Sequence, residues 1–494
     1  MTSADQLRLA SEFDTATKDR WRAMVDKVLR RSGVDVDSHD GAVEDLLASP
    51  TYDGFAIQPL YTADDTAPDA GFPGLPPFTR GSSPVGPVRG AVAIGWDVRQ
   101  RHAHPDVDTT RRAVLADLEN GVASLWLVVG EAGLPVDALP DVLADVYVDL
   151  APVTLDAGAD FVAAADALLA VHGDKTTEKG VRPGEVLGNL GADPIGHRAR
   201  TGTPADLDAA AALATRVAER YVNLRSVVVD ALPYHEAGSS DGQELGYALA
   251  TAVAYLRALT DAGLPVDRAV RQLEFRFAAT ADQFGTIAKL RAARRMWARV
   301  AEVCGAPQAA VPIHAVTSST MMTRRDPWNN MLRTTLACFA AGVGGADAVT
   351  VQPFDAAIGL PDAFARRIAR NTQSILLEES RAAGVIDPAG GSWYVERHTD
   401  ELAHAGWSVF QEVEKAGGIA AALDSGLVEE RIAAVRAART ARLDAGDEAI
   451  TGVTVFPNKD EKPLLREPEP AVPSGGLPRV RYAEPFEAAL EAKP

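Results

Sequence analysis

The stretch from Thr317 to Glu396 decides the fold of this chain. Its most specific segments are TRRDPWNN (323–330), AAGVGGADA (340–348), QPFDAAIGLP (352–361), ARNTQ (369–373) and DPAGGSWYVE (387–396). The glycines at 342–345 precede the apolar run Ala348–Gln352, so we expect them to end a helix and turn into a strand. A dinucleotide-binding loop would follow a strand instead. The stretch therefore predicts the last helix–strand unit of a longer series.

The same alternation of apolar runs and helical segments begins at about Val88. The runs expected to form strands are Ala91–Trp96, Ala123–Val129, Val146–Leu150, Glu185–Leu190, Ser226–Leu232, Leu273–Ala279, Val311–Thr317 and Ala348–Gln352. The segments with helical spacing include Thr109–Leu118, Asp156–His172, Pro204–Tyr221, Gly242–Thr260 and Phe284–Val303. Eight strands separated by helices predict a parallel sheet covered on its faces. The rhythm alone fits a closed barrel or an open doubly wound sheet.

Composition restricts the class of partner. The 494 residues include 49 Lys and Arg against 68 Asp and Glu, a formal net charge of −19, and 47% are hydrophobic. This acidic balance argues against a nucleic-acid partner and against binding to anionic membranes. No apolar run approaches the roughly 20 residues of a membrane span, and the polar start has no signal-peptide pattern. Cys304 and Cys338 lie far apart in helical patterns, which indicates buried, reduced thiols in a cytoplasmic protein.

The segments between Thr317 and Glu396 resemble the substrate domain of the methylmalonyl-CoA mutase family, the cobalamin-dependent acyl-CoA mutases. A second specific match runs from Phe275 to Ala293, and the likeness covers most of the chain from about Leu60. The resemblance implies a (β/α)8 TIM barrel, with a site at the carboxyl ends of its strands. It also implies rearrangement of an acyl-CoA thioester through radicals, for which adenosylcobalamin supplies the difficult chemistry.

We expect four regions along the chain. Residues 1–87 would form a helix, with an apolar stripe from Leu7 to Leu29, and an extended arm that wraps a partner. Residues 88–396 would form the barrel, and residues 397–450 a C-terminal helical segment. Residues 451–494, rich in proline and charge, predict an extended surface linker. The resemblance implies that such a linker leads to a cobalamin-binding domain, for which this sequence has no counterpart.

Two motifs of the family test whether the chain keeps a mutase site. The cobalt-binding signature, Asp-x-His-x-x-Gly, occurs at none of the nine histidines, so we expect this chain to bind neither cobalamin nor a metal. Catalytic members carry Thr-Ile-Arg-Gln-Tyr at the end of the first strand, where this chain has Asp97-Val98-Arg99-Gln100-Arg101. Arg99 and Gln100 match and would be relics of substrate binding, or Arg99 a structural ion-pair partner. Asp97 and Arg101 depart from the motif.

The third motif follows the fifth strand. Catalytic members carry Gly-Tyr-His-Met-Gln-Glu-Ala-Gly, whose His donates a hydrogen bond to the thioester carbonyl. Here the stretch 231–238 reads ALPYHEAG. Aligned without a gap, the catalytic position falls on Pro233, whose side chain cannot donate. A two-residue deletion would instead bring His235 into that position, in a loop whose geometry catalysis holds to about an ångström.

These departures predict a mutase barrel without mutase chemistry. Within the family they resemble the small, non-catalytic subunit of a heterodimer, whose large catalytic partner binds adenosylcobalamin. The alternative is a catalytic, substrate-binding subunit of a split acyl-CoA mutase, with its cobalamin domain on another chain. That alternative requires His235 and Arg99 to hold the substrate. A metabolite sensor or docking protein on an inactive barrel is a third hypothesis without specific support.

Two further motifs leave alternatives open. His102 and His104 are two residues apart, but a metal site would need a third ligand. Arg324-Arg325-Asp326 could clamp an anion, since the Arg fork suits carboxylates and phosphates. The same residues could start a helix, with Asp326 as its cap and Pro327 in the first position.

Overall fold

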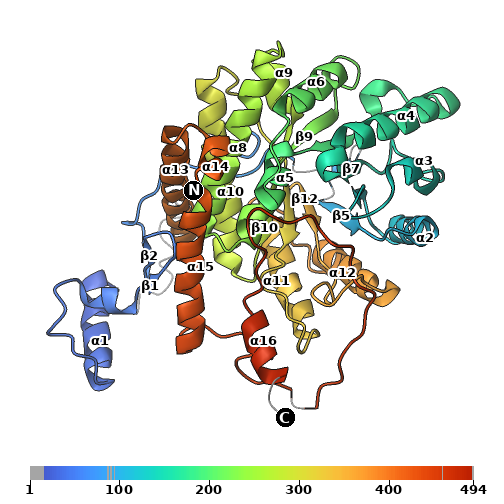
Figure 1. The fold of residues 1–494 in the computed structure, drawn as a ribbon. Coiled ribbons are helices and arrows are strands. Elements are labelled where there is room, and N and C mark those ends of the chain that lie inside the picture. Colours follow the sequence, from blue (N-terminus) through green and yellow to red (C-terminus); the bar gives the residue numbers. More distant parts are fainter. Residues whose placement is uncertain (1–15, 86–87, 90–91, 94, 459, 492–494) are drawn as a thin grey trace, which may run out of the picture. The chain divides into compact units, whose positions relative to one another are not determined.

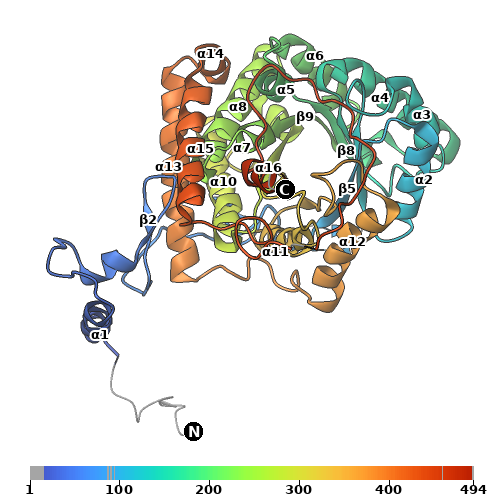
Figure 2. The same ribbon diagram turned by 60° about the horizontal axis from the view of Figure 1, so that its bottom comes forward.

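Eight parallel strands form a closed barrel in the computed structural model, which describes residues 16–491 except 86–87, 90–91, 94 and 459. The strands are β5 (Asp97–His102), β6 (Ser124–Val128), β7 (Val153–Asp156), β8 (Gly188–Ala192), β9 (Leu224–Asp230), β10 (Leu273–Ala279), β11 (Ile313–Thr317) and β12 (Ala348–Thr350). Each strand pairs with the next, and β12 pairs with β5 to close the ring (Figure 2). The ring confirms the (β/α)8 barrel and excludes the open sheet.

Helices follow the strands and surround the barrel (Figure 1). The main ones are α2 (Val107–Leu118), α4 (Phe161–Lys179), α6 (Leu207–Ala218), α8 (Asp241–Asp261), α10 (Gln283–Val303), α11 (Asn329–Val343) and α12 (Ala363–Ser374). Several start at a side chain that accepts a backbone N–H of the first turn, namely Asp106, Asp206, Ser240, Asp282 and Asp362. Such caps satisfy donors that have no partner within the helix.

Two of the expected strands are wrong. The first strand is not Ala91–Trp96 but the polar segment Asp97–His102, because alternate side chains of this strand face a polar barrel interior. Val92–Ala93 forms a short antiparallel pair with Val88–Arg89 instead. The third strand is Val153–Asp156, while the apolar run Val146–Leu150 lies in turns before it. A search for apolar runs therefore misses strands whose inward side is charged.

The stretch from 317 to 396 packs against the start of the barrel. Gly342 on α11 contacts Trp96, and a Cβ added there would lie 2.3 Å from the indole ring. The Trp96 Nε1–H donates to Gln373 Oε1 on α12 at 3.0 Å. On α10, the fully buried Arg291 forms ion pairs with Asp387 and Glu396. The stretch thus holds the start of the first strand against α11 and α12, the helices that follow the seventh and eighth strands.

Three helices follow the barrel: α13 (Trp393–Lys415), α14 (Ile419–Asp424) and α15 (Leu427–Ala445). α13 packs on α8 and α10. Beyond them, residues 452–483 have no helix among the described positions, and they run around the rim of the barrel mouth before the short α16 (Glu484–Glu491) (Figure 2). We call residues 452–491 the tail.

The N-terminal residues up to Asp65 form a compact unit of their own. It contains α1 (Lys18–Arg31), a 3-10 turn η1 (Val43–Leu47) and a small antiparallel pair, β1 (Ser49–Pro50) with β2 (Ala56–Ile57). An ion pair of 2.6 Å between Arg22 and Glu44 joins α1 to η1. The first part of the expected helical stripe, including Leu7 and Phe13, lies outside the described residues.

Candidate functional site at the barrel mouth

A cavity of about 450 Å³ lies at the carboxyl ends of the strands, where sites of (β/α)8 barrels are found. Loops after the strands form most of its wall, and the tail forms the rest. The charged lining residues used below are Arg101, Asp156, Arg200, Asp230, Glu236 and Arg276. Of the residues that the two catalytic motifs predicted, Arg101 lines this cavity, and Asp97, Arg99, Gln100, Pro233 and His235 do not; His102 and His104 also line it.

Arg99 forms ion pairs inside the barrel. Its Nη1 lies 2.6 Å from Glu274 Oε1 on β10, and its Nη2 lies 3.6 Å from Asp97. In the closed ring β11 and β12 separate β5 from β10, so the pair with Glu274 crosses the interior. Burial opposes the charge on Arg99, but Glu274 and Asp97 outweigh burial and raise its pKa. Arg99 is thus held as a structural ion-pair partner.

Gln100 points the other way. Neighbouring side chains of a strand alternate between its two faces, so Gln100 faces the surrounding helices while Arg99 faces inward. Its amide is buried, and neither its nitrogen nor its oxygen has a hydrogen-bond partner. Gln100 therefore keeps the family's residue type without reaching the cavity.

Large side chains fill the middle of the barrel. The guanidinium of Arg276 lies over the Trp126 ring at 4.2 Å, and that of Arg101 lies 5.6 Å from the same ring. The His314 ring meets Trp126 edge-on, with centroids 5.4 Å apart. Trp126 on β6 and Arg276 on β10 come from opposite sides of the ring. Burial, with Arg99 and Arg276 nearby, lowers the pKa of His314 well below its usual value.

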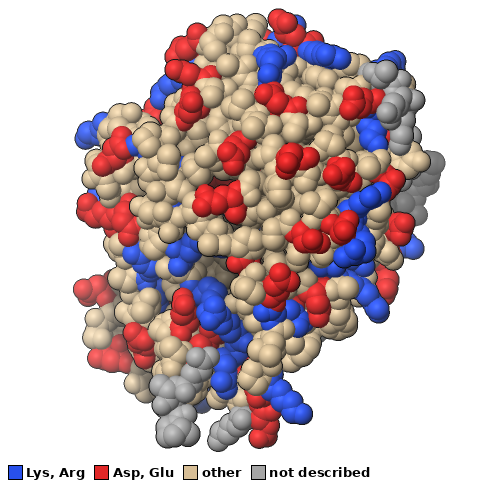
Figure 3. Space-filling model, turned by 45° about the vertical axis from the view of Figure 1, so that its right-hand side comes forward, with Lys and Arg blue, Asp and Glu red and all other residues tan. Residues whose placement is uncertain are grey.

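Opposite charges alternate around the cavity. Arg200 pairs with Asp230 at 2.8 Å and with Glu236 at 2.9 Å, and Arg276 lies 3.2 Å from Asp230. The molecular face in Figure 3 likewise carries acidic side chains among the basic ones. Burial and the nearby Asp230 raise the pKa of Asp193, at the start of α5 (Pro194–Thr201), to about 7. The cavity wall thus carries balanced charge.

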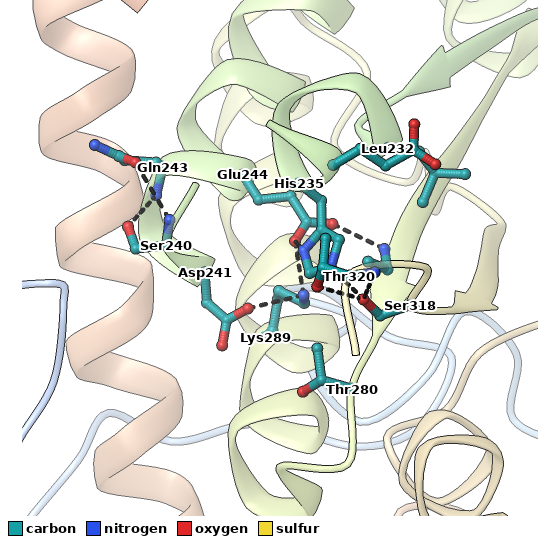
Figure 4. Close-up of polar contacts among 12 residues, drawn as sticks. Leu232, His235, Ser240, Asp241, Gln243, Glu244, Thr280, Lys289, Ser318 and Thr320 are labelled. Atoms are coloured by element: carbon teal, nitrogen blue, oxygen red, sulfur yellow. Dashed lines mark hydrogen bonds and ion pairs between the residues drawn. The ribbon is translucent and has the colours of Figure 1, made fainter. Parts of the chain in front are cut away.

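His235 sits beside the barrel in a closed polar network (Figure 4). It lies on α7 (Leu232–Glu236), after β9, with the buried Pro233 in the first turn. Its Nε2 is 2.6 Å from Ser318 Oγ, and its Nδ1 is 3.2 Å from Glu244 Oε2. Both ring nitrogens therefore have partners within the protein.

Lys289 completes this network. Its Nζ lies 2.7 Å from Glu244 and 2.8 Å from Asp241. Burial opposes ionisation of all three groups, but their mutual attraction outweighs it, which raises the pKa of Lys289 and lowers those of both carboxyls. Ser318, His235 and Glu244 resemble a hydrolase triad. However, Ser318 is buried, and its Oγ also accepts the Thr320 N–H at 3.1 Å, so the arrangement is structural.

The sequence search missed the residues that shape the cavity: Trp126, Arg200, Asp230, Glu236 and Arg276. A signal was present for two of them. Asp230 is the single charge of one expected apolar strand, and Arg276 occurs with Glu274 in another; charges so placed indicate an inward position in a polar barrel. Arg200 and Glu236 lie on short helices after strands, and their ion pair depends on contacts that no spacing rule gives.

Other sequence hypotheses have clear outcomes. His102 lies 3.5 Å from Asp117, and His104 lies 3.5 Å from Glu467; no cluster of three or more His, Cys, Asp or Glu among the described residues could hold a metal ion. Cys338 is buried as expected, but Cys304 is exposed at the end of α10, which corrects that expectation. No helix in the described part of the chain has the length and apolarity needed to span a membrane.

Comparison with known proteins identifies the family. The family model described as methylmalonyl-CoA mutase matches residues 50–474. The chain belongs to the methylmalonyl-CoA mutase family. It is 61% identical over 485 residues to the methylmalonyl-CoA mutase small subunit of Streptomyces virginiae, covering 98% of this chain and 77% of that protein. It is 41% identical over 492 residues to the small subunit of Propionibacterium freudenreichii subsp. shermanii, covering 98% and 76%.

A large subunit is more distant. The methylmalonyl-CoA mutase large subunit of Porphyromonas gingivalis is 30% identical over 476 residues, covering 88% of this chain and 66% of that protein. The resemblance inferred from the motifs is therefore confirmed, including the likeness to small subunits. Mutases of this kind are isomerases.

The family uses adenosylcobalamin, and the residues described at the barrel mouth do not fit that cofactor. Arg101 stands where catalytic members have tyrosine, and its guanidinium pairs with Glu469 of the tail at 2.7 Å. The tail forms part of the cavity wall.

Proposed function

We propose that this chain is the non-catalytic small subunit of adenosylcobalamin-dependent methylmalonyl-CoA mutase, which interconverts methylmalonyl-CoA and succinyl-CoA. The observation that carries the proposal is the filled barrel. The pair Arg99–Glu274 and the stack of Arg276 on Trp126 both cross the interior. An acyl-CoA has no path along the barrel axis while these contacts persist.

The position aligned with the catalytic histidine also lacks a hydrogen-bond donor for a thioester. Pro233 offers no donor. Turning His235 toward a substrate would break its contacts with Ser318 and Glu244, although Thr320 and Lys289 still contact these two side chains. Each hydrogen bond lost in this way contributes about 0.5–1.5 kcal/mol to stability. These costs favour the inward position of His235 and weigh against a split mutase that uses it.

The role of the chain would then be assembly. A large catalytic subunit would carry adenosylcobalamin and the substrate, and binding of this chain would stabilise it by mass action. The names of relatives support the pairing, since small and large methylmalonyl-CoA mutase subunits both occur among them. An obligate interface of this kind buries on the order of 2,000–5,000 Å².

The test compares three preparations: this chain alone, the large subunit alone, and the co-expressed pair, each with adenosylcobalamin and methylmalonyl-CoA. We expect turnover from the pair, none from this chain, and a lower thermal midpoint for the lone large subunit. Turnover by this chain alone would refute the proposal. Calorimetric binding of methylmalonyl-CoA to the lone chain would instead favour the split-mutase alternative.

A further inference from the structure

The loop before α11 presents three consecutive backbone N–H groups to carboxylates. Those of Arg324 and Arg325 donate to Glu487 Oε1, at 2.6 and 3.2 Å. That of Asp326 donates to Glu461 Oε1 at 2.6 Å. Asp326 has a φ of 43°, in the left-handed region, and successive N–H groups in such a turn form an anion-binding concavity. We call residues 324–326 the latch loop.

The sequence allowed two interpretations of this loop, an anion clamp or the start of a helix capped by Asp326, and the structure corrects the second. Trp328 is the N-cap of α11, which starts at Asn329, so Asp326 caps no helix. The side chain of Asp326 instead accepts from Asn329 Nδ2 at 2.7 Å. An anion is clamped here, and the clamp consists of backbone N–H groups more than of Arg side chains.

Both clamped carboxylates belong to the tail. Glu487 is buried on α16 and also accepts from Arg481 Nη1 at 2.9 Å. The second oxygen of Glu461 lies 3.0 Å from Arg325 Nε. Buried carboxylates need several donors to offset the loss of water, and each of these two has them. The contacts are therefore built into the fold at two points of the tail, 26 residues apart.

Between those two points lies the crossing segment of the tail, which follows the rim of the barrel mouth (Figure 2). The N–H of Gly476 donates to the Arg200 carbonyl at 3.0 Å, and the N–H of Val480 donates to the Glu236 carbonyl at 2.8 Å. The Arg479 side chain lies 3.3 Å from Glu236. Tail residues between 469 and 484 form part of the cavity wall. Lifting the crossing segment would therefore open the cavity.

We propose that the tail is a lid over the barrel-mouth cavity. The latch loop binds the tail residues Glu461 and Glu487 and so holds the lid closed at both ends. The crossing segment has no helix of its own before α16, so only its contacts with the barrel keep it in place. Segments of this kind open locally at lower free energy than the whole domain unfolds. Loss of the latch carboxylates frees the segment and admits small molecules to the cavity.

The test measures access to the cavity with a thiol reagent. Ser319 lines the cavity, and S319C places a reporter there. The exposed Cys304 is first removed as C304S, while the buried Cys338 stays. The rate of reaction with 5,5′-dithiobis(2-nitrobenzoate) is compared between this parent, E487Q, and E461Q/E487Q. We expect at least a tenfold faster reaction in the double variant, which corresponds to about 1.4 kcal/mol in the opening equilibrium.

Asp460 supplies the matched control, because it is adjacent to Glu461 in the tail, its side chain is exposed and it does not line the cavity. D460N should react at the parent rate, and circular dichroism should show that all variants fold. The proposal is overturned if E487Q and E461Q/E487Q react no faster than D460N. A parent that reacts as fast as a free thiol would also overturn it.

Hydrogen exchange on the unmodified protein provides a second test that does not depend on any variant folding. We expect the amides of Arg324–Asp326 to exchange together with those of Gly476 and Val480, at a rate faster than the barrel strands. The lid is contradicted if the latch-loop amides exchange only with global unfolding while the tail amides exchange earlier.

Discussion

At the scale of single residues, the barrel holds charged groups such as Arg99 and Arg276 inside by pairing them with carboxylates. The sequence could reveal which positions depart from the mutase motifs, namely Asp97, Arg101 and Pro233. It could not reveal that Arg99 would be neutralised by Glu274, because the two are 175 positions apart. Partners of this kind are set by strand order and register. The departures from the catalytic motifs could therefore be predicted from the sequence, but the contacts that the departing residues make could not.

The pair of Arg99 and Glu274 should be strongly coupled. Glu274→Gln leaves Arg99 buried with weaker compensation, and breaking a buried pair costs about 3–5 kcal/mol. The double variant Arg99→Met/Glu274→Leu should be less destabilised than Glu274→Gln alone, because no uncompensated charge remains. Urea unfolding of the single and double variants measures the coupling. Additive losses would show that the two side chains act independently.

Asp193 should make stability depend on pH. Its pKa is raised from 3.8 to about 7 in the folded protein, so the folded state retains a proton that the unfolded state has lost. The free energy of unfolding should therefore fall as pH rises from about 4 to 7 and level off above.

Asp193→Asn isolates this effect, since asparagine also caps helices well and can still accept from Tyr255 Oη and the Gly196 N–H. We expect the free energy of unfolding of this variant to rise relative to that of the wild type between pH 4 and 7, by a few kcal/mol at most. Urea unfolding at several pH values measures this difference. Parallel pH profiles for the two proteins would contradict a raised pKa at Asp193.

At the scale of elements, periodicity located six of the eight strands and the principal helices, because these strands contain short apolar runs that alternate with helical segments. It failed where a strand turns charge inward, as in Asp97–His102. The tail has no helix before α16 among its described residues, and its course along the barrel mouth depends on contacts such as that of Glu487 with Arg324. Long-range contacts between backbone and side chains leave no periodic trace.

The glycine of α11 that contacts Trp96 tests the packing of these elements. Gly342→Ala would place a Cβ 2.3 Å from the indole, and overpacking of this kind costs about 1–3 kcal/mol. Gly173→Ala on α4 is the control, because no heavy atom lies within 4 Å of its added Cβ. There alanine should be neutral or stabilising by up to about 1 kcal/mol. Thermal melts compare the two; equal shifts would mean that Trp96 moves aside without strain.

At the scale of the whole molecule, the polypeptide combines a barrel filled by its own side chains with a separate N-terminal unit that exposes apolar residues. On α1, Met24 and Val28 lie one turn apart, and each is 60% exposed. Exposed apolar groups so placed are typical of a surface that binds another protein. Such a surface fits the proposed role of the chain as a subunit of an assembly.

The N-terminal unit should therefore bind the large subunit, a prediction that depends on the proposed function. Met24→Ser/Val28→Ser removes apolar contact area from α1 without touching its buried residues Val25 and Leu29. Since burial of such side chains contributes about 1.5–3 kcal/mol each, we expect at least a tenfold weaker association, measured by co-purification and calorimetric titration with the large subunit. Lys27→Ser, at an exposed position of the same helix, should leave the affinity unchanged. Equal affinities for all three proteins would place the partner's contacts elsewhere on the chain.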